Sequence, residues 1–355
     1  MIFKFMTTNE MTLDEIIRKY HFVVCLTKTS RIKAKDLAVR EAMMVLNKRE
    51  AVFLPNGPLS DFKGSFIILV PKDRMEGIEQ DLDLLGYSNR YLLLDFEYPQ
   101  IGDETNLNIT SFIWKKRPFG VKELFVQNEE KYIAHSADNR LFKILDFEGK
   151  VKDVNGYRGD GKEIGRRALP VEDSKILINL AMPQEEEKLL DPFAGGGGII
   201  FEARQIQGLK LFSNDIDPVV SPGLESYGAN HTINDIRDLS YEDESFDVIV
   251  TEVPFAYSTT QIVCEGISRL TKILRYHGRM SIMCGEGQAE EIAKRARVEG
   301  LLCYSRIEVD RKGTPVVIFA FTKSYELWDE LCLLNKQTEN IVYKGQKDQK
   351  EDEFP

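Results

Sequence analysis

The chain has 355 residues, of which 43% are hydrophobic and 10% aromatic, and its formal net charge is −10. This composition excludes wholesale disorder, and the length predicts two or three domains. No apolar run reaches the about 18 residues of a membrane-spanning helix, and the N-terminus lacks the apolar core of a secretory signal. Five widely spaced cysteines favour free thiols over disulfides or a zinc site. We therefore expect a cytoplasmic protein without a metal.

The charge is distributed unevenly. Residues 1–50 carry 10 Lys and Arg against 6 Asp and Glu, and residues 1–150 are neutral as a whole. The acidic excess lies in the remainder of the chain. This distribution is compatible with a binding module joined to an acidic catalytic domain, and nearly as well with an acidic protein that binds no polyanion.

The front of the chain has the pattern of a mixed α/β region. Apolar runs predict strands at 21–27, 66–70 and 91–96, and helical spacing predicts helices at 35–46 and 74–85. This succession suggests a small ferredoxin-like or related α+β unit. Short alternating segments from 109 to 151 predict a β-meander or a connecting segment. We interpret residues 1–150 as one α+β module.

From residue 188 to residue 323 predicted strands and helices alternate, after a predicted helix at 171–182 with Pro170 at its first position. Such alternation is typical of a parallel sheet covered by helices, and two final strands, 304–309 and 316–322, imply one antiparallel strand. We expect a Rossmann-like α/β domain over 151–335. The polar residues 336–355 predict a disordered tail.

The strongest motif is LLDPFAGGGGIIFEA at 189–203, where a short strand leads through four glycines into a helix. Glycines let the backbone approach a ligand closely, as nucleotide sites require. About twenty residues later a second strand ends in NDID, which contains Asp215 and Asp217, and Asp235 follows in INDIRDL. Acidic side chains at these places suit ribose hydroxyls and an adenine amino group.

Together with SFDVIV at 245–250, these motifs resemble class I S-adenosylmethionine (SAM)-dependent methyltransferases. Within them, the chain is most similar to the RNA-methylating branch that carries an N-terminal THUMP module, whose best-known members make N2-methylguanosine in tRNA. The resemblance covers about residues 156–323, and the front half only by general architecture. It implies that Asp191, Ala194, Gly195 and Gly197 border the methionine part of SAM, that Asp215 holds the ribose, that Ile216 packs on the adenine, and that Asp235 binds the adenine amino group.

Amino-methyltransferases of this type carry a D/N-P-P-Y/F tetrad, which here is Glu252-Val253-Pro254-Phe255. The resemblance implies that Glu252 and the Pro254 carbonyl accept hydrogen bonds from a substrate amine, while Phe255 stacks on the base. The longer acid and the loss of the first proline are departures from the family pattern. They concern which substrate atom accepts the methyl group and whether the site is competent for catalysis.

Several alternatives remain open from the sequence. Asp215, Asp217 and Asp235 also suit helix caps or turns, and Glu252–Phe255 suits a plain strand end. Two basic clusters suit either solvent or RNA phosphates: Arg158, Lys162, Arg166 and Arg167, and Lys115–Arg117 beside Trp114. The expected function is methylation of an exocyclic amine in structured RNA, with tRNA as the partner and a small activating subunit as a further one. A DNA amino-methyltransferase and an inactive SAM- or RNA-binding subunit are the alternatives.

Overall fold

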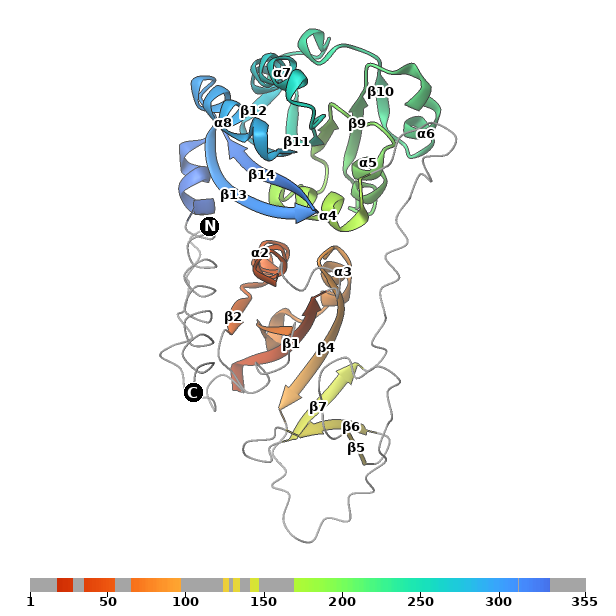
Figure 1. Ribbon diagram of the computed structural model, residues 1–355. Coiled ribbons are helices and arrows are strands. Elements are labelled where there is room, and N and C mark those ends of the chain that lie inside the picture. The colour runs from red at the N-terminus through yellow and green to blue at the C-terminus, as the bar shows by residue number, and fades with distance from the viewer. Residues whose placement is uncertain are drawn as a thin grey trace. The chain divides into compact units, whose positions relative to one another are not determined.

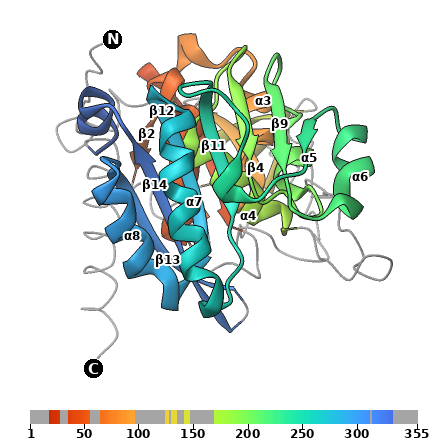
Figure 2. The same cartoon turned by 90° about the horizontal axis from the view of Figure 1, so that it is seen from above.

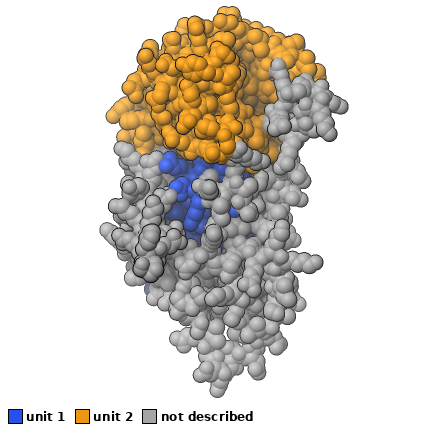
Figure 3. Space-filling model, viewed as in Figure 1, with its two compact units in different colours: residues 1–153, 338–355 blue, residues 154–337 orange. Residues whose placement is uncertain are grey.

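The computed structural model describes residues 18–27, 35–54, 65–96, 124–127, 130–134, 141–146, 169–311 and 313–332. The chain divides into two compact units, the first with residues 1–153 and 338–355 and the second with residues 154–337 (Figure 3). The predicted tail, 336–355, lies outside the described residues, and the domain limits predicted from the sequence remain a prediction.

The first unit is built on one antiparallel sheet (Figure 1). Its elements are β1 (Tyr20–Thr27), α2 (Lys35–Leu46), β2 (Val52–Leu54), β3 (Ser65–Pro71), α3 (Ile78–Asp83), β4 (Ser88–Phe96), β5 (Leu124–Gln127), β6 (Glu130–Ala134) and β7 (Leu141–Asp146). The strand order is β2-β3-β1-β4-β7-β6-β5. Elements β1 to β4 follow one another as β-α-β-β-α-β, the order of a ferredoxin-like unit.

Most of the predicted front elements are present, with two corrections. The helix predicted over 74–85 is shorter: Lys72–Arg74 form a 3-10 turn, and α3 starts only after Gly77, whose φ of +69° interrupts a continuous helix. β2 was not predicted, because three residues give too short a pattern. The expected meander is present as β5, β6 and β7, and β7 pairs with β4, so it extends the same sheet.

The second unit is a seven-stranded, mostly parallel sheet with helices on both faces (Figures 1 and 2). Its elements are α4 (Val171–Ala181), β8 (Lys188–Asp191), α5 (Gly198–Ala203), β9 (Lys210–Asn214), α6 (Ser221–Ser226), β10 (Asn230–Thr232), β11 (Phe246–Glu252), α7 (Thr260–Ile273), β12 (Leu274–Gly285), α8 (Ala289–Val298), β13 (Leu302–Arg311) and β14 (Thr314–Thr322). The strand order is β10-β9-β8-β11-β12-β14-β13, with β14 antiparallel to both neighbours. This confirms the predicted Rossmann-like sheet.

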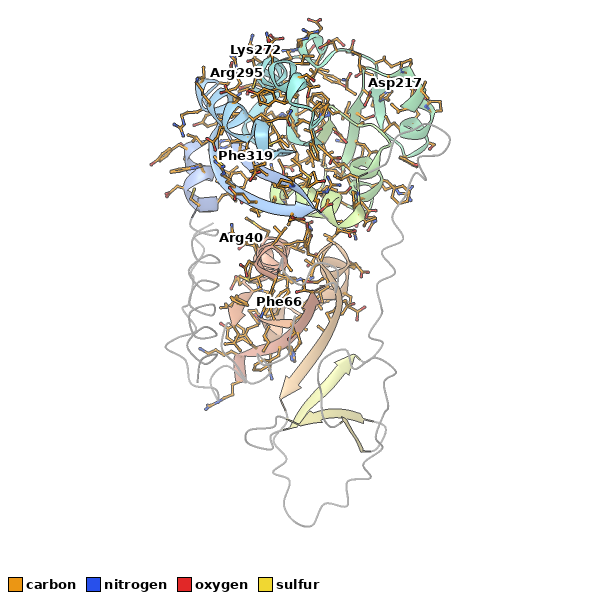
Figure 4. All side chains as sticks on the ribbon, viewed as in Figure 1. Arg40, Phe66, Asp217, Lys272, Arg295 and Phe319 are labelled. Carbon is orange, nitrogen blue, oxygen red and sulfur yellow. The ribbon has the colours of Figure 1, made fainter. Side chains whose placement is uncertain are left out.

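Apolar side chains of this sheet form its core with one helical layer. Residues of β8, β11, β12 and β14, among them Phe319, pack against α7 and α8. Figure 4 shows Phe319 within the sheet and Asp217 toward α6. The alternation of buried strand runs and amphipathic helices therefore positions the loops that follow the parallel strands.

Several boundaries in the second unit differ from those predicted. Pro170 caps α4 instead of opening it. The helix predicted from GIIFEARQIQ at 198–207 is shorter: α5 ends at Ala203, and Gln205 and Ile206 donate to carbonyls three residues back in a closing turn. The region near 221–230 holds α6 and then β10, a strand that was not predicted because it is three residues long.

No helix within the described residues has the length and apolarity needed to cross a membrane. The same part of the chain contains no group of three or more His, Cys, Asp or Glu side chains arranged to hold a metal ion.

Candidate functional site

Three parallel strands of the second sheet end at one edge and bring acidic residues together. β8 lies between β9 and β11 and runs parallel to both. Asp191 ends β8, Asp215 follows the end of β9, and Glu252 ends β11. In the strand register Asp191 lies opposite Ser213, two residues before Asp215, and Leu190 lies opposite Ile249, three residues before Glu252, so the three carboxylates lie at the same edge. The motifs predicted from distant segments therefore meet at one site.

The glycine loop after β8 is tied to the end of β9. The N–H of Ala194 donates to the carbonyl of Asn214 at 3.0 Å, and the N–H of Gly195 donates to Asp215 Oδ2 at 2.8 Å. Gly195 has a φ of +48°, and a Cβ placed on it would meet only a carbonyl oxygen 4.0 Å away. The loop thus presents backbone and open space beside Asp215, as a bound ligand requires.

The last two glycines of the run, Gly197 and Gly198, serve packing, and the place predicted for Gly197 beside the methionine part of SAM stays a prediction. Gly197 has a φ of +78°, and its Cβ would lie about 3 Å from the Leu224 and Tyr227 side chains of α6. The Cβ of Gly198 would lie 2.9 Å from the carbonyl oxygen of Leu169. Both positions demand glycine because protein already fills the space where a side chain would stand.

We expect Gly198→Ala to lower the free energy of unfolding by about 1–3 kcal/mol, because the added methyl overpacks against backbone that cannot move aside easily. The matched control is Gly223→Ala in α6, where nothing lies within 4 Å of the new Cβ. That variant should be neutral or slightly stabilised, since alanine favours helix. Urea unfolding measures both, and equal stabilities would contradict the packing role of Gly198.

Asn214 organises the loops at this edge. Its side chain donates to the carbonyls of Pro192 at 3.3 Å and Asn234 at 3.0 Å, and its Oδ1 accepts from Thr232 Oγ1 at 3.0 Å. It is 1% exposed. One buried amide therefore holds the ends of β8, β9 and β10 together. Sequence reasoning missed Asn214, which it passed over as the residue before an aspartate.

Asp215 is a buried acceptor beside an exposed apolar surface. It is 9% exposed, and besides Gly195 it accepts from the N–H of Asp217 at 2.9 Å. Ile216, next in the chain, is 66% exposed, and Ile233, which follows β10, is 50% exposed. Exposed isoleucines next to a carboxylate suit a flat apolar ring carried on a hydroxylated sugar. The sequence did not single out Ile233.

Asp217 and Asp235 both cap 3-10 turns. Asp217 accepts from the N–H of Val219 at 3.0 Å. Asp235 accepts from the N–H of Arg237 at 2.9 Å and pairs with its guanidinium at 2.7 Å. The hydrogen bonds from Arg237 lower the pKa of Asp235 to about 2. Asp235 lies after β10, beyond Ile233. Its role toward an adenine amino group stays a prediction, and its carboxylate would have to accept from that group while it is paired with Arg237.

Asp191 is buried at the centre of the edge. Its Oδ1 accepts from Thr251 Oγ1 at 2.8 Å and from the N–H of Phe193 at 3.3 Å. Burial raises the pKa of Asp191 to about 7, although both hydrogen bonds oppose the rise. Because Thr251 directly precedes Glu252, this bond also links the glycine loop to the tetrad position.

Asp191 predicts a pH dependence of stability. Its pKa in the folded protein, about 7, lies above the value of 3.8 expected when it is unfolded. Folding therefore favours the protonated acid, and its contribution to stability falls as pH rises from about 4 to about 7. We expect the Asp191→Asn variant to become more stable relative to wild type as the pH rises from 5 to 8, by on the order of 1–4 kcal/mol in the free energy of unfolding. Urea unfolding without ligand at both pH values measures this, and a constant difference would contradict it.

The tetrad position lies at the end of β11 and is held by residues far away in the chain. Glu252 Oε1 accepts from Arg311 Nη1 at 2.5 Å, and Arg311 Nε pairs with Asp173 Oδ2 at 3.0 Å. Burial raises the pKa of Glu252, and Arg311 opposes that rise. The Arg311 guanidinium also lies 5.8 Å from the ring centre of Phe255. Arg311 and Asp173 were not among the predicted site residues.

Val253 stands where the D/N-P-P-Y/F tetrad has its first proline, and its backbone N–H takes part in the sheet. Its N–H donates to the Met283 carbonyl at 3.0 Å and extends the pairing of β11 with β12 by one residue. A proline at this position has no N–H to give. The strand therefore continues further here than the family motif allows.

The Pro254 carbonyl is already engaged. It accepts from Gln288 Nε2 at 2.9 Å and from Thr259 Oγ1 at 3.0 Å. Gln288 is 1% exposed and also accepts from the N–H of Gly285. Gln288 thus fixes the loop that carries Phe255, and no local sequence signal marks it. The role predicted for the Pro254 carbonyl stays untested. The two basic clusters, at 115–117 and 158–167, lie outside the described residues.

No family model matches the chain. It is 31% identical over 126 residues to the tRNA (guanine(10)-N2)-dimethyltransferase of Pyrococcus abyssi, a match that covers 31% of this chain and 37% of that protein. It is 36% identical over 98 residues to the probable tRNA (guanine(10)-N2)-dimethyltransferase of Methanothermococcus thermolithotrophicus, covering 24% and 60%. A solved putative RNA methyltransferase from Pyrococcus horikoshii matches at 17% identity over 44% of this chain and 85% of that one, with a TM-score of 0.38.

The chain spans between 27% and 37% of the length of the first three curated relatives that it matches. The sequence matches confirm the predicted resemblance. The matched part of the chain is related in sequence to part of the tRNA (guanine(10)-N2)-dimethyltransferases.

Proposed function

We propose that this protein is a SAM-dependent methyltransferase that methylates an exocyclic amine of a base in structured RNA, with N2 of a guanosine in tRNA as the acceptor. The observation that carries the proposal is the meeting of two half-sites at one sheet edge. Asp215 with Ile216 forms a nucleoside-type half, and Glu252 with Phe255 forms an acceptor half. The curated relatives supply the choice of guanine and tRNA.

The residues present fit the cofactor. Asp215 would accept from ribose hydroxyls, and the exposed Ile216 and Ile233 would cover the two faces or the edge of the adenine. The open space over Gly195 would admit the ligand close to the backbone, with Asp191 and Ala194 bordering it. When bound, SAM supplies an electrophilic methyl group on a sulfonium.

The acceptor half would orient the amine. Phe255 would stack on the base, and Glu252 would accept a hydrogen bond from the amine so that the nitrogen lone pair points at the methyl carbon. Glu252, or water beside it, would take the proton that the nitrogen gives up when it is methylated. Positioning and desolvation are the main contributions of the protein to this step.

Phe255→Ala should reduce methylation of tRNA by about one to two orders of magnitude, since stacking contributes about 1–3 kcal/mol per base. SAM affinity should stay unchanged, because the side chain lies at the acceptor half. Tyr276→Ala, an exposed aromatic residue of β12, is the matched control and should keep full activity. Initial rates with labelled SAM measure both, and equal rates for Phe255→Ala and wild type would remove Phe255 from the site.

The first unit would bind the RNA, largely through shape and backbone, as a THUMP-like module. Its β-α-β-β-α-β order and the balance of +4 over residues 1–50 support this role. A small activating subunit remains a prediction of the family resemblance. Recovery of one specific small protein with the intact chain from its native cell would support that partner.

The test of the proposed function is transfer of label from SAM to total tRNA, followed by digestion and identification of the nucleoside. Labelled N2-methylguanosine or N2,N2-dimethylguanosine is expected. In a parallel assay with DNA as the acceptor, label in the DNA and none in the tRNA would favour a DNA amino-methyltransferase. Label in a different nucleoside would overturn the choice of guanine N2.

An inactive SAM- or RNA-binding subunit is the second candidate, because Glu252 is paired with Arg311 and the family's first proline is absent. In that case calorimetry would show SAM binding while no RNA or DNA accepts label. Transfer to any tRNA by the purified chain would exclude it.

A further inference from the structure

Arg311 connects three separate segments at the acceptor half of the site. It ends β13, next to the turn into β14, and its guanidinium pairs with Glu252 at the end of β11 and with Asp173 in the first turn of α4. The Arg311 side chain is 17% exposed, Glu252 27%, and Asp173 fully buried. A buried carboxylate and a strand end thus fix the direction of the guanidinium.

The pair leaves one donor and one acceptor group at the site. Among contacts within the described residues, Arg311 uses Nε for Asp173 and Nη1 for Glu252 and Met283, and none involves Nη2. Arg311 donates to Oε1 of Glu252, and no hydrogen bond to Oε2 occurs within the described residues. A guanidinium carries five N–H donors and a carboxylate about four acceptor positions, so both groups have capacity for a ligand.

This donor and acceptor stand next to the ring that would stack a base. The Arg311 cation lies 5.8 Å from the centre of the Phe255 ring. A base stacked on Phe255 would therefore present its edge to Arg311 and Glu252. Guanine offers adjacent N–H groups at N1 and N2 to a carboxylate, and its O6 is an acceptor for an arginine donor.

We propose that Arg311 is a specificity-determining residue that reads O6 of the target guanine while Glu252 binds the N1 and N2 side of the same edge. This inference rests on the proposed function for the choice of guanine. It also accounts for the glutamate at position 252, where the family tetrad has Asp or Asn. The longer Glu252 reaches an arginine partner, and the pair binds the base edge as one unit.

The experiment compares binding of two nucleotides to the full chain in the presence of SAM. Guanosine monophosphate carries O6, whereas the monophosphate of 6-thioguanosine carries a sulfur there, which is a much weaker hydrogen-bond acceptor, and keeps both the N1–H and the amine at position 2. Wild type should bind the guanine nucleotide about tenfold or more tightly, as expected for one hydrogen bond from a charged donor. Arg311→Met should bind the two nucleotides equally, mainly through weaker binding of the guanine nucleotide.

The controls separate recognition from folding. Arg306→Met removes another arginine of β13, which pairs with Glu290 and Glu308, and it should keep the wild-type preference. Because Arg311→Met leaves buried Asp173 without this partner, the double variant Arg311→Met with Asp173→Asn is measured as well and should also show no preference. SAM affinity in each variant reports that the second unit is folded.

The outcomes separate the two proposals. No preference in wild type, including no binding of either nucleotide, or a preference retained in both Arg311 variants, overturns the role of Arg311. If the preference is present and depends on Arg311 while tRNA accepts no label, the proposed function fails and the guanine-reading pair stands. If tRNA is methylated at guanine N2 without that preference, only the inference about Arg311 fails.

Discussion

Asp215→Ala is expected to weaken SAM binding by about 100-fold. The carboxylate would accept hydrogen bonds from the ribose, and hydrogen bonds to a charged group contribute about 1.5–3 kcal/mol each. It also accepts from the backbone of Gly195 and Asp217, so its loss releases the glycine loop from the end of β9. Titration calorimetry with SAM measures the effect.

Asp217→Ala is the matched control for Asp215. Asp217 lies two residues away and caps a short 3-10 turn through Val219, so its removal should change SAM affinity only a few-fold. Far-UV circular dichroism and the unfolding midpoint report that both variants are folded. If Asp215→Ala binds SAM as wild type does, the ribose assignment is wrong and the loop must hold its ligand by other groups.

Glu252→Ala is expected to reduce the turnover of tRNA by about 30- to 1000-fold, which corresponds to about 2–4 kcal/mol for a polar group that acts in the transition state. It removes the acceptor for the amine and leaves Arg311 paired with Asp173 but not with the end of β11. Glu252→Gln keeps an oxygen acceptor and should lose less. SAM affinity should remain unchanged in both variants.

Single-turnover rates with saturating SAM test this order, in which wild type is fastest, Glu252→Gln is slower and Glu252→Ala is slowest. Glu308→Gln on β13 is the control, because it removes a carboxylate that pairs with Arg306 instead of Arg311, and it should retain full turnover. If alanine and glutamine variants both match a wild type that is active, Glu252 takes no part in the reaction. The acceptor would then have to be sought elsewhere on the edge.

The sequence by itself predicted the fold of the second unit and the position of the glycine loop beside Asp215. The alternation of strands and helices, and the limits of α2 at 35–46, follow from periodicity within single segments. The glycine loop and Asp215 were found for the same reason, because a strand end, a glycine run and a carboxylate form a local pattern. These elements require no knowledge of distant contacts.

Short elements and helix ends were beyond the sequence pattern. β2 and β10 have three residues each, and they exist because neighbouring strands offer hydrogen bonds. α5 stops at Ala203, although the apolar spacing continues, because the chain turns toward β9. In these places pairing and packing outweighed local propensity.

Only the tertiary structure showed what surrounds Glu252. Arg311 lies 59 positions further along the chain and Asp173 lies in a helix before the glycine loop, so no spacing rule connects them. Because β14 runs antiparallel to β12, its hairpin with β13 returns the end of β13 to the edge where the parallel strands stop. The sheet topology, rather than any motif, decided that the acidic tetrad position has an arginine beside it.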